Sequence, residues 1–324
     1  MSQLQKAVAT LLNADTSSIS FERITEGLSH NCFLCNCGEE KYFVKVYALA
    51  KDPAKQIAQI NRTTEYMRQQ GIPAPELVAY SARFANVVIH RFIDAEKADW
   101  DFNLIAPLAG LYSDIAAIGL LKQRFLGRHT YLENLRGIEN QLCQLVDEQT
   151  GRSAALSGQA LMLCQRVVRE VSKLDSNAEL LFLNLHDDFT EKNILTRNGR
   201  ICLLCDWDSY RPAVFWENLA SSACRFSTPA PLGGGLEHQR LRQFLQSLAP
   251  QVVQQLGDTH TFARLFAHLG ILRHLRTFTF RSRVVATRRP DLEQSLLINP
   301  VKHCEWMADR SDEVASLVID SLPE

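Results

Sequence analysis

Hydrophobic and polar positions follow two different periods along this chain, and the first is that of β-strands. Between residues 20 and 93, short apolar runs are separated by polar turn residues. The runs predict strands at residues 32–37, 42–47, 76–81 and 86–92. Because the first two are separated by a Gly38-Glu39-Glu40 turn, we expect them to form a β-hairpin.

One helix is predicted among these strands. Residues 53–70 have helical spacing, and Gly71 with Pro73 and Pro75 beyond it provides the usual stop signals. Residues 1–13 are also helical in pattern, but they are polar and unlike a signal peptide. The first part of the chain is therefore predicted to be a sheet with one inserted helix.

From residue 94 the apolar positions recur with the spacing of α-helices. Long helices are predicted at residues 104–121, 131–146, 155–174, 239–256 and 261–283. Between the third and the fourth lies a compact region, 181–208, in which apolar runs flank a loop rich in acids. Its two strand-like pieces, 193–195 and 200–206, are joined through Asn198-Gly199, which is a strong hairpin signal.

The length of the chain indicates two lobes. Its 324 residues exceed the size at which a single core stops growing. We place the boundary where the period changes, giving a sheet lobe at residues 1–93 and a helical lobe at residues 94–324. The expected fold class is α+β, with an antiparallel sheet in the first lobe, and a cleft between lobes is a common ligand site.

Composition and charge exclude several classes of partner. The chain is 46% hydrophobic and 22% charged, as is usual for a soluble globular protein. A formal net charge of −1 provides no field that would attract nucleic acid or an anionic membrane. We find no apolar run of about 18 residues that would span a bilayer. We therefore expect a cytoplasmic protein with neither nucleic acid nor membrane as a partner.

The nine cysteines are an odd number in a chain without a secretory signal, which argues for reduced thiols. Cys32-x-x-Cys35 and Cys202-x-x-Cys205 together imitate a zinc-binding pattern. Both pairs lie in strand-like runs, where alternation sends the two sulfurs of a pair to opposite faces. We expect buried thiols and not a zinc site.

Candidate catalytic residues gather in residues 186–193, which read His-Asp-Asp-Phe-Thr-Glu-Lys-Asn. Asp188 is followed five residues later by Asn193, and thirteen residues after that by Asp206. This order would place a hydroxyl-activating carboxylate beside oxygen ligands of the kind that Mg²⁺ prefers. The alternative is a surface loop whose Asp and Asn side chains bond locally. The order favours phosphoryl transfer, because other kinase-like segments occur in sequence across residues 20–226.

This arrangement resembles the aminoglycoside phosphotransferase and choline kinase family, which are small-molecule kinases with a protein-kinase-like, two-lobed fold. Their catalytic loop reads His-x-Asp-x-x-x-x-Asn, with a metal-binding Asp one hairpin later, and His186, Asp188, Asn193 and Asp206 match it. The resemblance implies that Asp188 orients the acceptor hydroxyl and accepts its proton, and that His186 braces the loop. It also implies that Asn193 and Asp206 hold Mg²⁺ on the phosphates of ATP.

Three positions depart from the family pattern. Asp187 stands where the family usually has Gly, and Asn218 stands where it often has Asp before Leu-Ala. Asp206 is followed by Trp207-Asp208 and not by the Phe-Gly of protein kinases. The last departure is usual in the small-molecule branch, which often carries a second acid near the position of Asp208.

Lys45 is a lone cation in the apolar strand 42–47, so it needs an anionic partner if it faces the cleft. The resemblance implies that Lys45 contacts the ATP phosphates. The alternative is a lysine that reaches solvent from an edge strand. Upstream, residues 26–31 resemble the family's nucleotide loop, in which Ser29, His30 and Asn31 would donate to phosphate.

Residues 87–94 resemble the family's interlobe hinge. There the backbone of His90 and Phe92 would meet the adenine edge, and we expect the His90 side chain to face solvent. In kinases of this fold a helix glutamate pairs with the lysine, but the corresponding position falls on Ile60 or Asn61. Glu65, one helical turn later, either substitutes for that glutamate or is an exposed helix acid.

Six arginines lie within residues 271–289: Arg273, Arg276, Arg281, Arg283, Arg288 and Arg289. Arg273 and Arg276 share a helix face, so they would suit a carboxylate or phosphate on the acceptor. A solvated basic helix face is the simpler interpretation, and we favour it. With the arginines outside, the remaining acids favour a cationic or neutral acceptor.

The sequence therefore predicts an ATP- and Mg²⁺-dependent phosphotransferase. It would move the γ-phosphoryl group to a hydroxyl of a small molecule, such as an amino alcohol, a sugar or an amino sugar. The alternative is a catalytically inactive nucleotide-binding protein of the same fold, suggested by the missing helix glutamate. The retained Asp188, Asn193 and Asp206 argue against it, and no Ala-Pro-Glu segment of a protein kinase follows Asp206.

Overall fold

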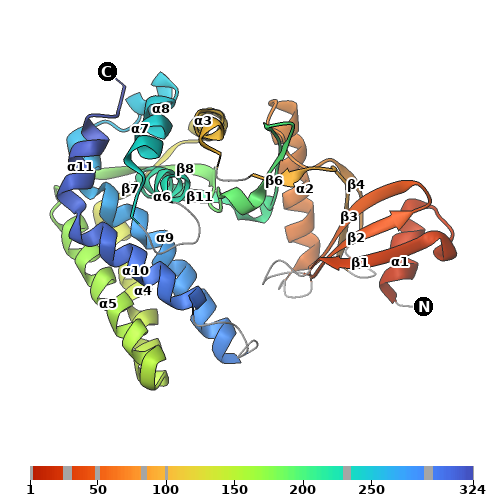
Figure 1. Cartoon of the computed structure of the whole chain (residues 1–324), viewed down its shortest axis with the longest axis horizontal. Coiled ribbons are helices and arrows are strands. Elements are labelled where there is room, and N and C mark those ends of the chain that lie inside the picture. Colours follow the sequence, from red (N-terminus) through yellow and green to blue (C-terminus); the bar gives the residue numbers. More distant parts are fainter. Residues whose placement is uncertain are drawn as a thin grey trace. The chain divides into compact units, whose positions relative to one another are not determined.

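The computed structural model describes residues 3–24, 31–47, 52–81, 86–98, 101–228, 235–287 and 295–323 (Figure 1). The chain divides into two compact units, and each unit is assembled from two stretches of sequence. The first unit comprises Met1–Ala98 and Lys192–Tyr210, and the second comprises Asp99–Glu191 and Arg211–Glu324. The structure thus places a hairpin from the middle of the chain with the first unit, whereas the sequence suggested one boundary after residue 93.

The first unit is built on a five-stranded antiparallel sheet with the order β1-β2-β3-β5-β4. Its strands are β1 (Ile19–Ile24), β2 (Asn31–Cys37), β3 (Glu40–Val46), β4 (Leu77–Ser81) and β5 (Val87–Arg91). The four predicted strands are confirmed as β2 to β5, and Gly38 has the positive φ of +60° that its hairpin turn requires. The expected sheet is extended by β1 at its edge.

Alternation along β3 decides which side chains enter the core. Tyr42 and Val44 are buried in the cluster that helix α1 (Gln3–Leu12) covers with Val8 and Ala9 (Figure 1). Lys45 follows Val44, so its side chain leaves the opposite face of the sheet. Cys35 belongs to the same buried cluster, whereas Cys32, three residues earlier, lies near Lys45. The predicted separation of these two thiols is confirmed.

The predicted inserted helix is α2 (Pro53–Gln69). Asp52 caps it by accepting a hydrogen bond from the Lys55 N–H at 3.1 Å, and Pro53 occupies the first turn, where its missing N–H costs nothing. The chain leaves the helix through Gly71, whose φ of +84° is unfavourable for other residues. Local signals therefore define both ends of α2.

The second unit is mostly helical, which confirms the α+β class. Its helices are α3 (Ile105–Leu120), α4 (Arg128–Glu148), α5 (Gly151–Ser172), α6 (Phe215–Ser227), α7 (His238–Gln246), α8 (Pro250–Gln254), α9 (Thr259–Thr287), α10 (Ser295–Asp309) and α11 (Ser311–Ile319). The predicted helix 239–256 is wrong as a single element, because α7 ends at Gln246 and Pro250 begins a separate helix, α8. The other four predicted helices are confirmed. Helix α9 contacts α4, α5, α6, α10 and α11 and is the centre of this unit.

Two small sheets carry the candidate site. In the second unit, β7 (Arg124–Gly127), β8 (Glu179–His186) and β11 (Tyr210–Val214) have the order β11-β8-β7. In the first unit, β6 (Glu96–Lys97), β9 (Ile194–Arg197) and β10 (Arg200–Leu204) have the order β10-β9-β6. Asn198 and Gly199 have φ values of 51° and 69°, as the hairpin between β9 and β10 requires.

Helix α3 and the short turn η2 (Phe102–Leu104) that precedes it form a stretch long and apolar enough to cross a bilayer, with a mean hydropathy of 1.4 over Phe102–Leu120. The expectation that no such stretch exists is therefore wrong by length and composition. However, 56% of that stretch is buried inside the protein. Gly119 allows part of this packing, since a Cβ there would lie 2.7 Å from the Asn184 carbonyl oxygen of β8. Burial against β8 thus accounts for the apolar sequence.

Three buried histidines make stability depend on pH. Burial lowers the pKa of His90 to about 4, and burial also lowers the pKa values of His268 and His274. Below pH about 6.5 the unfolded chain binds protons that the folded chain does not. We therefore expect the free energy of unfolding to fall between pH 6.5 and 5, by at most about 1.4 kcal/mol per pH unit for each histidine.

Urea unfolding at pH 7.5, 6.5 and 5.5 measures this loss. His274→Phe should reduce the pH dependence, whereas His129→Gln, at a side chain that is 79% exposed, should leave it unchanged. An unfolding free energy that is constant between pH 7.5 and 5.5 would contradict the expectation.

Candidate functional site

The predicted site residues fall into two groups, and each group lies within one unit. Lys45, Asn193, Asp206 and Asp208 belong to the first unit. His186, Asp187 and Asp188 belong to the second. The first group combines a cation with oxygen ligands, and the second surrounds a carboxylate with arginines.

Lys45 is an ion-pair centre in the first unit. Its side chain is 9% exposed, and its Nζ donates to Asp206 Oδ1 at 2.7 Å and to Asp208 Oδ2 at 2.9 Å. Tyr47, two residues further along the same face, donates its hydroxyl to Asp208 Oδ1 at 3.0 Å. The alternative of a lysine that reaches solvent is wrong, and the anionic partner that Lys45 needs consists of two carboxylates.

The opposite charges of Lys45, Asp206 and Asp208 stabilise one another. Burial opposes the ammonium charge of Lys45, but the nearby Tyr47, Asp208 and Asp206 outweigh it and raise the Lys45 pKa above its usual value. The Lys45 Nζ also lies 5.1 Å from the centre of the Tyr47 ring, within reach of a cation–π interaction. Burial raises the pKa of Tyr47 above its usual value, so the phenol stays protonated and donates.

A strained turn brings both carboxylates to Lys45. Asp206 has the left-handed backbone conformation, with φ 62° and ψ 47°, and the short helix η4 (Trp207–Ser209) follows it. The Trp207 ring is buried and donates from Nε1 to the Leu204 carbonyl at 2.7 Å, which fixes the turn. A left-handed backbone costs energy for a residue with a Cβ, and such residues concentrate at functional sites.

The β9–β10 hairpin brings Asn193 close to Asp206 in the fold. Asn193 ends the short helix η3 (Glu191–Asn193), is buried, and accepts at its backbone oxygen from the Cys205 N–H at 2.7 Å. Asp206, which follows Cys205, has a side chain that is 38% exposed and therefore accessible to a ligand. Amide and carboxylate oxygens of this kind fit Mg²⁺. Among the described residues no three His, Cys, Asp or Glu side chains form a metal cage, so Mg²⁺ would need phosphate oxygens as well.

The other residues predicted to contact the nucleotide are described by the structure only in part. Ser29 and His30 lie outside the described residues. Asn31 begins β2, and its Oδ1 accepts from Arg23 at 3.1 Å. The Phe92 N–H donates to the Lys41 carbonyl at 3.2 Å.

The expectation that the His90 side chain faces solvent is wrong. His90 lies in β5, between β3 and β4, and its side chain is buried there. Its residue pairs with Phe43 on one side and Leu77 on the other. The alternating pattern alone did not show that this strand is covered on both faces.

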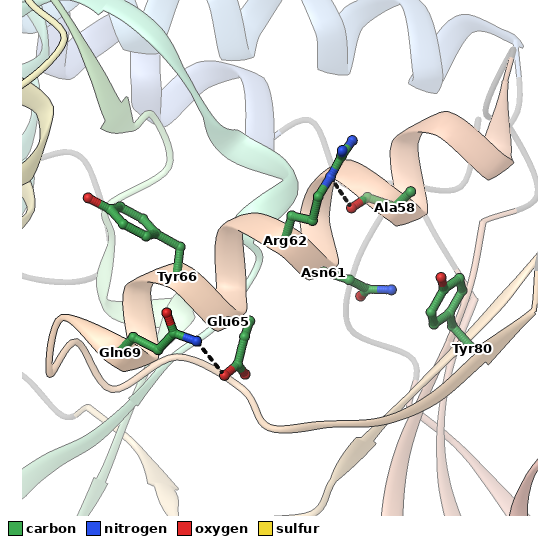
Figure 2. Close-up of a pocket in the computed structure, with 7 residues that line it drawn as sticks. All are labelled: Ala58, Asn61, Arg62, Glu65, Tyr66, Gln69 and Tyr80. Atoms are coloured by element: carbon green, nitrogen blue, oxygen red, sulfur yellow. Dashed lines mark hydrogen bonds between the residues drawn. The ribbon is translucent and has the colours of Figure 1, made fainter.

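Glu65 does not replace the missing helix glutamate. It accepts from Gln69 at 3.1 Å and pairs with Arg68 at 3.5 Å, and its side chain is 54% exposed. It lines a pocket of about 490 Å³ together with Ala58, Asn61, Arg62, Tyr66, Gln69 and Tyr80 (Figure 2). In the part of the chain that the structure describes, Lys45 forms its ion pairs with Asp206 and Asp208. The interpretation of Glu65 as an exposed helix acid is therefore the correct one.

In the second unit, strand β8 delivers the predicted catalytic segment. His186 is its last residue and is buried beside Phe189, at 6.5 Å between ring centres. Phe189 packs edge-on against Tyr112 and Phe226, which anchors the loop in the helical core. This packing holds the backbone on both sides of Asp187 and Asp188.

Arginines surround the two carboxylates of this loop. Arg273 of α9 donates from Nη1 to Asp187 Oδ2 at 3.1 Å and from Nη2 to Asp188 Oδ1 at 2.6 Å. Arg211 of β11 also donates to Asp187 Oδ2, from Nε at 2.9 Å. The side chains of Asp187 and Asp188 are 10% and 11% exposed, so they need these cations. Asp187, in the family's Gly position, thus holds two arginines.

Two further ion pairs continue this network. Arg276 of α9 binds the buried Glu217 of α6, which also accepts from the Tyr131 hydroxyl at 2.8 Å. Arg225 of α6 binds Glu191 in two places, with Nε at 2.7 Å from Oε2. Glu217 raises the pKa of Arg276 against the effect of burial. The solvated basic face that we favoured is therefore wrong for Arg273 and Arg276, whereas Arg283 is exposed, and Arg288 and Arg289 lie outside the described residues.

Several residues of these clusters were missed in the sequence. Tyr47, Arg211, Arg225 and Tyr131 reach the site from separate elements, and the Lys45–Asp206 contact spans 161 positions. Spacing within one segment carries no signal of such contacts. Glu217 directly follows Phe215 and Trp216 in α6, and an acid beside such large apolar residues is a local sign that a cation lies opposite.

Residues 20–266 match the model of the phosphotransferase enzyme family, which is more than half of the chain. The sequence matches none of the curated proteins with which it was compared. The match to the family model confirms the resemblance that the loop residues suggested.

Solved structures share the fold over nearly the whole chain. A choline kinase from Cryptosporidium parvum Iowa II is 11% identical with a TM-score of 0.61, and the match covers 98% of this chain and 96% of that one. A spectinomycin phosphotransferase bound to ADP and spectinomycin is 14% identical with a TM-score of 0.61, covering 96% and 98%. A microcompartment-associated aminopropanol kinase is 10% identical with a TM-score of 0.61, covering 99% and 98%. The kinase-like fold is thereby confirmed.

The Lys45 cluster predicts unequal effects of two substitutions. Lys45→Met leaves Asp206 and Asp208 without their shared cation, and we expect it to lower the free energy of unfolding by about 2–3 kcal/mol. The loss stays below that of a fully buried pair because Asp206 is 38% exposed. Glu65→Gln should change it by less than about 0.5 kcal/mol. Chemical denaturation measures both, and equal losses would contradict this assignment of partners.

Proposed function

We propose that this chain, which belongs to the phosphotransferase enzyme family, transfers the γ-phosphoryl group of ATP to a hydroxyl group of a small molecule. The observation that carries the proposal is the ion pair of Lys45 with Asp206, because it joins the two charged groups that phosphoryl transfer requires on the nucleotide side. The spectinomycin phosphotransferase of the same fold was solved with ADP, which supports nucleotide binding by this chain.

The residues of the first unit hold the nucleotide. Lys45 contacts the phosphates, and Asp206 and Asn193 supply oxygen ligands to Mg²⁺. When bound, Mg²⁺ neutralises charge on the phosphates. Asp208 and Tyr47 keep Lys45 oriented through the contacts at 2.9 Å and 3.0 Å. Ser29, His30, Asn31 and the backbone of His90 and Phe92 complete the nucleotide contacts in this proposal. In this proposal the nucleotide-binding lobe is the whole first unit, residues 1–98 with 192–210, and not residues 1–93 alone.

The residues of the second unit handle the acceptor. Asp188 accepts a hydrogen bond from the acceptor hydroxyl and takes its proton. The oxygen–phosphorus bond to ADP breaks, and a new one forms to the acceptor oxygen. His186, buried beside Phe189, braces the loop. Catalysis rests on positioning and on charge stabilisation more than on proton removal.

A catalytically inactive nucleotide-binding protein is the competing function. It was suggested by the absence of the helix glutamate that pairs with the lysine in kinases of this fold. Asp206 and Asp208 serve as the anionic partners of Lys45 in place of that glutamate, although they come from a much later segment of the chain. The loss of the glutamate therefore does not leave Lys45 without an anionic partner, and this observation favours an active enzyme. We expect that enzyme to act in the cytoplasm.

Asp188→Asn tests the catalytic assignment. A carboxamide keeps the size of the side chain but cannot accept the hydroxyl proton, so turnover should fall by about 10²- to 10⁴-fold with ATP affinity nearly unchanged. The measurement is acceptor-dependent release of ADP, with ATP binding measured by calorimetry. Asp147→Asn, at an exposed position of α4, is the matched control and should retain full activity. A loss smaller than about tenfold in Asp188→Asn would remove Asp188 from this role.

Asp206→Ala tests the metal assignment. Without this carboxylate the site loses a ligand to Mg²⁺, so we expect Mg²⁺ to stop strengthening ATP binding. Calorimetric titration of ATP with and without Mg²⁺ shows the difference in wild type and in the variant. If both proteins respond equally to Mg²⁺, Asp206 is not a metal ligand.

A further inference from the structure

One of the two carboxylate oxygens of Asp188, Oδ1, is bonded to Arg273. The Arg273 Nη2 lies 2.6 Å from Asp188 Oδ1, and the Arg273 side chain is 24% exposed. The same guanidinium holds Asp187 at 3.1 Å through Nη1. Arg273 therefore has one anchored nitrogen and one nitrogen on the catalytic carboxylate, and both nitrogens belong to a side chain that a ligand can reach.

Among the charged side chains around this loop, arginines outnumber carboxylates. Four carboxylates lie here, and they belong to Asp187, Asp188, Glu191 and Glu217. Five arginines face them: Arg211, Arg225, Arg273, Arg276 and Arg281. The fifth, Arg281, is held close to Arg225 and Asp188, and burial together with Arg225 lowers its pKa. His274, buried beside them, is neutral because burial lowers its pKa far below the usual value.

A cationic acceptor does not fit this arrangement. Each of the four carboxylates already has an arginine partner, and an ammonium group would approach arginines at close range. If its hydroxyl took Asp188 Oδ1, the Nη2 of Arg273 would lose a charged hydrogen bond without replacement, which is costly at a partly buried site. The acids of this region, which favoured a cation in the sequence, are therefore not available to bind one.

We propose that the acceptor carries an acid group, a carboxylate or a phosphate, which bonds Arg273 while the acceptor hydroxyl takes its place on Asp188. The inference rests on the proposed phosphotransfer. Asp187 keeps Arg273 Nη1, so the side chain exchanges one bond and stays in place. The guanidinium fork matches the planar oxygens of an acid group.

Phosphoryl transfer to an acid-bearing acceptor follows the same course as transfer to any other hydroxyl. The acceptor hydroxyl gives its proton to Asp188, its oxygen bonds the γ-phosphorus of ATP, and ADP leaves with the electrons of the broken bond. The product is a phosphate monoester that retains its acid group. In this step Arg273 exchanges its bond to Asp188 Oδ1 for a bond to the acid group of the acceptor, so the guanidinium has an anionic partner before and after binding.

Acceptor pairs that differ by one acid group test the proposal on the full chain with Mg²⁺ and ATP. The carboxylate pairs are serine with ethanolamine, threonine with 1-aminopropan-2-ol, and glycerate with glycerol. Glycerol 3-phosphate with glycerol tests phosphate as the source of the acid group. We expect kcat/KM to be higher for an acid member by about 10- to 100-fold, the value of one charge-assisted hydrogen bond. Higher values for the cationic or neutral members throughout would overturn the proposal.

Arg273→Ala should raise KM for the acid acceptor and abolish the preference within its pair. Arg273→Lys keeps the positive charge but lacks the forked guanidinium, so it should retain part of the preference for the acid acceptor. Because it keeps a cation beside Asp187 and Asp188, it also controls for a folding defect in Arg273→Ala. Arg264→Ala, at an exposed arginine of the same helix, is the matched control and should keep the full preference. An unchanged preference in both Arg273 variants would also overturn the proposal.

Binding without turnover separates this proposal from the proposed function. Calorimetric titration of glycerate, glycerol 3-phosphate and glycerol into wild type and Arg273→Ala requires no phosphoryl transfer. Weaker binding of the acids to Arg273→Ala supports the inference even if no acceptor releases ADP, in which case the phosphotransfer proposal alone fails. Equal binding of acids and glycerol to wild type contradicts the acid-group inference even if turnover is found.

Discussion

A charged side chain that is withdrawn from water needs an opposite charge beside it, and both units of this protein depend on that constraint. In the first unit, Lys45 is the cation, and Asp206 and Asp208 are the carboxylates that surround it. The register of β3 turns Lys45 away from the core cluster, and the left-handed turn at Asp206 aims the acids at it. The strain of that turn is offset by the ion pairs that it makes possible.

The second unit meets the same constraint with arginines. Helix α9 passes through its centre and presents Arg273 and Arg276 on one face, each to a carboxylate from another element. The result is a network in which Asp188 forms an ion pair with Arg273. In the function proposed here, an acceptor hydroxyl that binds Asp188 Oδ1 takes the place of the arginine, and an acid group on the acceptor then gives Arg273 a new partner. We therefore propose that the ion pairs of this loop also select its ligand.

Local pattern predicted much of this fold. Alternation and turn residues define β2 to β5, and the cap and stop signals of α2 define its ends, because these signals act within a few residues. The loop motif indicated the correct family from four residues. Apart from the break between α7 and α8, the main errors concern partners distant in sequence. The Arg273–Asp188 contact spans 85 positions, so helical spacing showed that Arg273 and Arg276 share a face but not what that face meets. The position of Glu65 and the burial of His90 likewise depend on packing that no single segment encodes.

Phosphorus NMR of the full chain with Mg²⁺, ATP and a hydroxy acid tests the central claim most directly, because it observes the transferred group itself. The account predicts a new phosphate monoester resonance that grows as the γ-phosphate signal of ATP disappears, and that is absent when the hydroxy acid is omitted. ATP that stays intact with every acceptor, or that yields only ADP and inorganic phosphate, would contradict it.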